Sequence, residues 1–135
     1  MVGRHPATAT GLVYGSGALI AGEANDRRMW ALHARALQRG VVPVVPAGCV
    51  VEVWRGVRQS SLVRLLAGCR VESLDDAQAR RAGALRRQVS DDVGAIDATV
   101  VEAAMRRASA VVTSDRGDIS QLASAARRRV QIIDI

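Results

Sequence analysis

Residues 95–123 read AIDATVVEAAMRRASAVVTSDRGDISQLA and contain the pattern that decides the fold. A helical pattern that begins near Asp97 leads into the short apolar run 110–113, which we predict to be a buried strand. The run ends abruptly before Asp115, and Asp118 follows three residues later. A helix that feeds a buried strand is typical of a parallel sheet, and the carboxylates would emerge at the carboxyl end of that strand.

The rest of the chain alternates in the same way between short apolar runs and helical patterns. Further strands are predicted over 11–14, 41–45, 69–74 and 130–133. Helices are predicted over 18–23, 27–39, 60–67, 76–89 and 119–128. Two further helices are predicted: one begins at Pro46 and ends at Gly56, and the other is capped at 90–92 and carries Asp97. This alternation predicts an α/β fold, a three-layer αβα sandwich around a parallel sheet of about four to five strands.

Length and composition fit one globular domain. The chain has 135 residues and is 49% hydrophobic, which is enough for one core. We expect a flexible N-terminal tail over 1–10, without the apolar segment of a signal peptide, and a single domain over 11–135. The apolar region 41–54 contains two prolines and a glutamate and is too short to cross a membrane. These features predict a cytoplasmic protein without membrane contact.

The charge of the chain indicates an anionic partner. The net charge is +6, and all 19 basic residues other than histidine are arginine. The planar guanidinium group suits phosphates, which makes nucleic acid the first candidate, although an arginine- and alanine-rich chain can also reflect genomic composition. The absence of lysine excludes a P-loop, and no GxGxxG follows the first strand. The scarcity of aromatic residues disfavours folds that stack bases on aromatic platforms.

Several carboxylates are expected to meet at one edge of the sheet. The loops at Gly15 and Asp115 both follow strands, Asp97 begins a helix near the same edge, and Glu52 lies on the helix after the second strand. Gathered carboxylates repel one another unless they are protonated, paired with arginine or bridged by a cation. Mg²⁺ and Mn²⁺ prefer oxygen ligands and can activate water against a phosphate. An acidic site on an arginine-rich surface therefore suits phosphodiester cleavage.

Each acid also has an ordinary structural explanation. Asp115 and Asp118 can cap the helix that follows them. Asp97 can be a first-turn acid that the helix dipole favours. Glu52 lies in an apolar run and can pair with an arginine. The order of these acids along an alternating α/β chain is more specific than any one of them.

The sequence resembles the PIN-domain family, and more narrowly the VapC-type toxins of bacterial toxin–antitoxin pairs. The resemblance covers nearly all of residues 11–135 and is carried by GLVYGSGALIAGE, VVPAGCVVEVWRG and the stretch quoted above. It implies an αβα fold and endoribonuclease activity that depends on Mg²⁺ or Mn²⁺. It also implies a homodimer, an RNA substrate, and inhibition by a VapB-like antitoxin inserted into the acidic groove.

The resemblance also implies roles for particular residues. Asp97 and Asp115 match acids that would hold the metal directly, whereas Glu52 and Asp118 would hold it directly or through water. The expected catalytic and metal-binding residues are therefore Glu52, Asp97, Asp115 and Asp118. Ser16 and Thr113 match small hydroxyl residues that support the acids.

Gly15 departs from the family pattern. The family has an aspartate after the first strand, whereas this chain reads VYGSGALIA, with Gly15 at that position. Glycine offers no side-chain ligand, and Mg²⁺ typically relies on only one or two direct carboxylates, so metal binding and catalysis should weaken. Three explanations are open: an engineered inactive variant, which the otherwise intact pattern favours, a naturally degenerate member, or compensation by Asp118 and Glu52.

Two hypotheses follow for function. The first is a metal-dependent endoribonuclease toxin whose activity is impaired at Gly15. The second is a non-catalytic module of the same fold that binds RNA or an antitoxin through its arginine-rich surface.

Overall fold

Five parallel strands form the centre of the molecule. The computed structural model describes residues 10–135, so the predicted tail over 1–10 lies outside the described residues except for Thr10. The strands lie in the order β3-β2-β1-β4-β5, and every pairing is parallel. Their bounds are β1 (Gly11–Tyr14), β2 (Val44–Pro46), β3 (Arg70–Glu72), β4 (Ser109–Thr113) and β5 (Ile132–Asp134). The predicted parallel sheet is confirmed.

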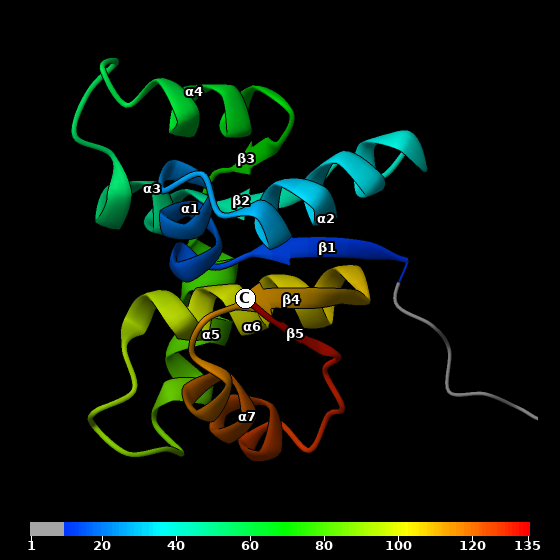
Figure 1. The fold of residues 1–135 in the computed structure, drawn as a ribbon. Helices are drawn as coiled ribbons and strands as arrows, with labels where there is room; N and C mark the ends of the chain where they lie inside the picture. The colour runs from blue at the N-terminus through cyan, green and yellow to red at the C-terminus, as the bar shows by residue number, and fades with distance from the viewer. Residues whose placement is uncertain (1–9) are drawn as a thin grey trace, which may run out of the picture.

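The described part of the chain forms seven helices, most of which cover the two faces of this sheet. Their bounds are α1 (Ser16–Glu23), α2 (Arg27–Gln38), α3 (Ala47–Val53), α4 (Ser60–Ala67), α5 (Asp76–Arg86), α6 (Ala95–Arg107) and α7 (Arg116–Ala125). Helices α1, α2 and α4 lie on one side of the sheet, and α5, α6 and α7 on the other (Figure 1). The predicted αβα sandwich is therefore confirmed. Within residues 10–135, no helix has the length and apolar character needed to span a bilayer.

The two central strands are buried because helices cover both of their faces. All residues of β4 are buried, and Val111 and Val112 have no exposed surface. Val13 of β1 is equally enclosed. Strands covered on both faces read as continuous apolar runs rather than as alternating patterns. This explains why the run before Asp115 identified a strand and why the acids that follow it emerge at a fixed place.

Four helices begin elsewhere than the sequence predicts: α1 begins at Ser16 rather than at 18, α3 at Ala47 rather than at Pro46, and α6 and α7 differ as follows. The helix that carries Asp97 was expected to be capped at 90–92, but α6 begins at Ala95 with Gly94 as its N-cap. Residue Val93 is fully buried and its N–H donates to the carbonyl of Ser90, so this segment forms a turn that covers the core. Helix α7 begins at Arg116 rather than at 119 and ends at Ala125 rather than at 128.

Most strands and one further helix are shorter than predicted. The runs 41–45, 69–74 and 130–133 contain strands of three residues each, at 44–46, 70–72 and 132–134. Pro46 ends β2 and serves as the N-cap of α3 instead of beginning the helix. Helix α5 ends at Arg86, not near 89, and Asp75 is its N-cap. Apolar runs extend beyond the residues that pair, because loop residues also pack on the core.

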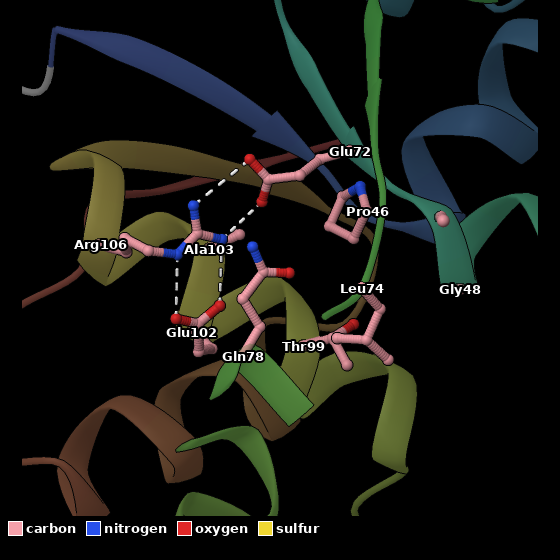
Figure 2. Close-up of a pocket in the computed structure, with 10 residues that line it drawn as sticks. Pro46, Gly48, Glu72, Leu74, Gln78, Thr99, Glu102, Ala103 and Arg106 are labelled. Atoms are coloured by element: carbon pink, nitrogen blue, oxygen red, sulfur yellow. Dashed lines mark hydrogen bonds and ion pairs between the residues drawn. The ribbon is translucent and has the colours of Figure 1, made fainter. Parts of the chain in front are cut away.

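A buried ion-pair network fixes α6 against its neighbours. Glu102 is only 3% exposed, and its carboxylate accepts hydrogen bonds from Arg81 at 2.9 Å and from Arg106 at 3.0 Å. Arg106 also donates to Glu72 at the end of β3 (Figure 2). Arg107 donates to the same carboxylate. The cavity beside this network measures about 10 Å³, which is room for about one water. The network therefore holds the helix that carries Asp97 and leaves no space for a substrate.

Candidate metal centre

An open groove lies at the carboxyl ends of the central strands. It has a volume of about 290 Å³. Glu52, Asp97 and Asp115 line it, together with the hydroxyl residues Ser16 and Thr113. The ends of parallel strands are where α/β folds usually bind their ligands. The structure thus places most of the acids singled out in the sequence in one groove.

Asp97, Asp115 and Asp118 form a cluster of carboxylates. One oxygen from each lies within 4.8 Å of the others. Asp97 is in the first turn of α6, Asp115 is the N-cap of α7, and Asp118 is in the first turn of α7. The positive ends of two helix dipoles therefore face the cluster and offset part of its charge. Asp118 belongs to this cluster although it does not line the groove itself.

The helix-capping explanation for Asp115 is correct but uses only part of the side chain. Its Oδ1 accepts a hydrogen bond from the N–H of Asp118 at 3.4 Å, and its own N–H donates to Oγ1 of Thr113 at 2.9 Å. Of the two carboxylate oxygens of Asp115, only Oδ1 accepts the hydrogen bond that caps α7. Capping and metal binding are therefore compatible at Asp115, because a carboxylate has two oxygens with several lone pairs.

Glu52 faces the groove from α3 and is held by a hydroxyl group. Oγ of Ser16 donates to Oε1 of Glu52 at 2.5 Å. An arginine partner was the ordinary explanation for this glutamate, but within residues 10–135 its side-chain partner is Ser16. An ideal Cβ on Gly48 would lie 2.6 Å from Cδ1 of Ile96, so glycine allows α3 to approach the start of α6. This close approach brings Glu52 to the same groove as Asp97.

Within residues 10–135, the carboxylates of the groove lack basic partners, whereas five carboxylates elsewhere form ion pairs. Arginine side chains pair with the acids Glu23, Glu72, Asp76, Glu102 and Asp134. In the described part of the chain, no ion pair includes Glu52, Asp97, Asp115 or Asp118. In a chain with 19 arginines and a net charge of +6, this leaves a local concentration of uncompensated negative charge.

Burial and mutual repulsion shift the titration of these acids. Burial, followed by the charges of Asp115 and Asp118, raises the pKa of Asp97 to about 6. The charge of Glu52 acts in the same direction, which agrees with its position across the groove. The pKa of Asp118 is also raised, by burial and then by Asp115. A divalent cation would relieve this repulsion, and oxygen-only ligands suit Mg²⁺ or Mn²⁺.

Comparison with known families identifies the domain. The model of the PIN domain family matches residues 16–125, which is most of the chain. The chain belongs to the PIN domain family. No match is found among curated protein sequences.

Solved structures share the fold of this PIN domain. VapBC2 from Rickettsia felis, bound to a DNA fragment from its promoter, is similar with a TM-score of 0.70 and 13% identity over 92% of this chain and 98% of that chain. A toxin–antitoxin complex from Klebsiella pneumoniae is similar with a TM-score of 0.60 and 18% identity, over 82% of this chain and 91% of that chain. FitAB bound to the IR36 DNA fragment is similar with a TM-score of 0.58 and 16% identity, over 91% of this chain and 94% of that chain. At such identities the likeness is one of fold.

Gly15 lies at the end of β1 in this PIN domain, beside the groove. Its backbone is extended, with φ −80° and ψ 176°, and it is the N-cap of α1 without any side-chain cap. An ideal Cβ there would lie 3.5 Å from the carbonyl oxygen of Val112 and 3.9 Å from Oγ1 of Thr113, which are ordinary contacts. An aspartate would therefore fit without strain and would also cap the helix.

The PIN domain contains site features that the sequence did not reveal. Ser114 lines the groove and lies against Gly17, where no Cβ could be accommodated without displacing it. Cys49 is buried one helical turn before Glu52, and burial raises the pKa of its thiol to about 12. The neutral thiol is a poor metal ligand. Only the spacing of glycines in GSG and AGC hinted at these close contacts.

The raised pKa of Asp97 predicts that Asp97→Asn stabilises the metal-free PIN domain. The folded-state pKa of about 6 exceeds the ordinary value of 3.8, so the ionised carboxylate costs stability. This cost is full above pH 6 and vanishes as the pH falls below about 4. We expect a gain of about 1 kcal/mol at pH 8, discounted for the partial exposure of the group. Urea unfolding with chelator at pH 8 and pH 5 measures it.

Asp91→Asn is the matched control for this stability measurement, because Asp91 is exposed in the preceding loop. It should change stability by less than about 0.5 kcal/mol. A loss of stability for Asp97→Asn at pH 8, or a gain that grows on acidification, would contradict the account of the site.

Proposed function

We propose that this PIN domain is a metal-dependent endoribonuclease, the toxin of a toxin–antitoxin pair, and that it cleaves RNA phosphodiester bonds. The observation that carries the proposal is the cluster of Asp97, Asp115 and Asp118, whose oxygens lie within 4.8 Å without a basic partner in residues 10–135. The similarity of fold to a toxin–antitoxin complex from Klebsiella pneumoniae supports the toxin assignment.

The donor set of the groove fits a hard divalent cation. Asp97 and Asp115 would hold Mg²⁺ or Mn²⁺ directly, and Glu52 and Asp118 would hold it directly or through water. A cation bound there would polarise the phosphodiester and lower the pKa of the attacking water. Ser16 would orient Glu52 through its hydrogen bond, and Oγ1 of Thr113 would fix the backbone of Asp115.

Gly15 leads us to propose that catalysis is impaired in this chain. The end of β1 provides no side-chain oxygen, although a Cβ would have room there. The remaining acids would bind a cation more weakly, because Mg²⁺ depends on very few direct carboxylates. The same observation favours the second candidate function, a non-catalytic PIN domain that binds RNA or an antitoxin.

The proposed partners are an RNA substrate, a VapB-like antitoxin and a second copy of the chain. The solved complexes of similar fold support the antitoxin. Apolar side chains are also exposed near the groove, with Ile20 at 55% and Val51 at 80%. Ile20 lines the groove, so its apolar side chain is available for contact with a partner bound there. The homodimer and the cytoplasmic location rest on the resemblance and on composition.

A chelator titration separates the two candidate functions. We expect slow cleavage of a mixed RNA pool by the unaltered protein with millimolar Mn²⁺, complete loss with excess EDTA, and recovery when Mn²⁺ is restored. Asp97→Asn is the inactive control. RNA binding that resists EDTA and falls steeply with salt, without cleavage at any metal concentration, would support the binding module instead.

A further inference from the structure

The groove requires positive charge that its own lining does not provide. RNA is a polyanion, whereas the described residues that line the groove include acids and no base. A cation would neutralise the phosphate at the reacting centre, but the adjoining phosphates would still approach uncompensated carboxylates. A guanidinium group at the rim would remove that repulsion.

Arg116 is placed to provide this charge. It is the first residue of α7, directly after Asp115 and two residues before Asp118. Its guanidinium does not pair with either acid but turns towards β5. Nε lies 2.8 and 3.1 Å from the two carboxylate oxygens of Asp134, and Nη2 lies 3.1 Å from the carbonyl of Ile132. Asp134 is paired in register with Thr113, which lines the groove.

Both partners of this ion pair have side chains that are about half exposed to solvent. Asp134 lies on β5, and its carbonyl accepts a hydrogen bond from Arg28. The Arg116 side chain is 54% exposed and that of Asp134 is 55% exposed. Exposed pairs contribute little to stability and exchange readily with solvent. The guanidinium of Arg116 can therefore leave this carboxylate for a stronger acceptor.

We propose that Arg116 is an RNA-binding residue of the groove, and that Asp134 holds it at the rim until a phosphate replaces that carboxylate. The inference rests on the proposed RNA substrate. A phosphate can accept two parallel N–H bonds from the fork of Arg116, whereas Asp134 accepts only the N–H of Nε, which its two oxygens share. Asp134 thereby competes with RNA for the same guanidinium and keeps Arg116 from neutralising Asp115 and Asp118.

The proposal predicts that breaking the pair from its two sides has opposite effects on RNA affinity. Arg116→Gln should weaken binding about three- to ten-fold and lower the salt slope by about 0.7, which corresponds to one lost phosphate contact on a single strand. Asp134→Asn should tighten binding about two- to five-fold, because the arginine no longer has to leave a carboxylate. When Asp134→Asn is added to the Arg116→Gln protein, we expect a much smaller gain in RNA affinity than when it is added to the unaltered protein.

The experiment measures fluorescence anisotropy of a labelled 20-nucleotide single-stranded RNA at several salt concentrations with Mg²⁺. It uses the Gly15 chain, with a gel to verify that the RNA stays intact. Arg80→Gln is the control, because Arg80 also forms an exposed pair, with Asp76 on α5. Arg80→Gln also removes one positive charge, so it measures how far RNA affinity falls from the change in net charge alone. Thermal melts verify that each variant is folded.

The outcomes separate this inference from the proposed function. If the unaltered chain binds no RNA at any salt concentration, the proposed RNA substrate and the role of Arg116 both fail. If it binds RNA but Arg116→Gln behaves like Arg80→Gln, only the role of Arg116 fails. If Asp134→Asn weakens binding as Arg116→Gln does, the pair is structural and the proposal is overturned.

Discussion

Gly15→Asp is expected to raise the rate of Mg²⁺- or Mn²⁺-dependent RNA cleavage by at least about 100-fold. The extended backbone of Gly15 accepts any residue, and the nearest atom to an added Cβ is 3.5 Å away. The new carboxylate would emerge from the end of β1, next to the β4 end that leads to Asp115. The measurement is cleavage of a mixed RNA pool by the two proteins, with and without metal.

Gly94→Asp is the matched control for this gain. Gly94 is also an N-cap with an extended backbone, has open space around its Cβ position and lines the same groove. It differs in reaching the groove from α6 rather than from the end of β1. We expect no comparable gain from it. If Gly15→Asp stays inert on varied RNAs with either metal, the nuclease function is contradicted.

In the Gly15→Asp protein, Asp97→Asn or Asp115→Asn is expected to remove the gain, with a loss of about 100-fold or more. Asparagine keeps the shape of the side chain but loses the charge that holds a cation. The same Asp97→Asn change should stabilise the metal-free fold, because burial and then the charges of neighbouring acids disfavour the ionised form of Asp97. Loss of activity with retained stability therefore excludes unfolding as the cause.

Rates at several Mn²⁺ concentrations, with unfolding curves for each protein, measure this second effect. Asp91→Asn, in the loop before α6, should leave the rate unchanged. An Asp97→Asn protein that cleaves RNA as fast as its parent would show that the acidic cluster is not the reacting centre.

The centre of the sheet was predictable because β4 and the second half of β1 are buried and read as apolar runs. The apolar runs before Gly15 and Asp115 belong to β1 and β4, which lie side by side in parallel register. Both strands end at the same edge of the sheet, and the helix that leads into β4 begins at that edge. The sequence alone therefore predicts that Asp97, at the start of this helix, lies near Asp115, which follows β4.

The detail of the groove was not predictable, because it depends on contacts between distant segments. Helix α6 begins after the predicted cap because Val93 is drawn into the core. The partner of Glu52 is Ser16, a residue 36 positions away. The attachment of Arg116 to Asp134 likewise depends on how β5 lies beside β4. No local pattern specifies these contacts.

The most direct test of the metal centre is a manganese anomalous difference map from crystals of the Gly15→Asp protein soaked in MnCl₂. The account predicts a peak in the groove within direct bonding distance of the carboxylates of Asp97 and Asp115. A groove without anomalous density at millimolar Mn²⁺, or an ion bound only elsewhere on the molecule, would contradict it.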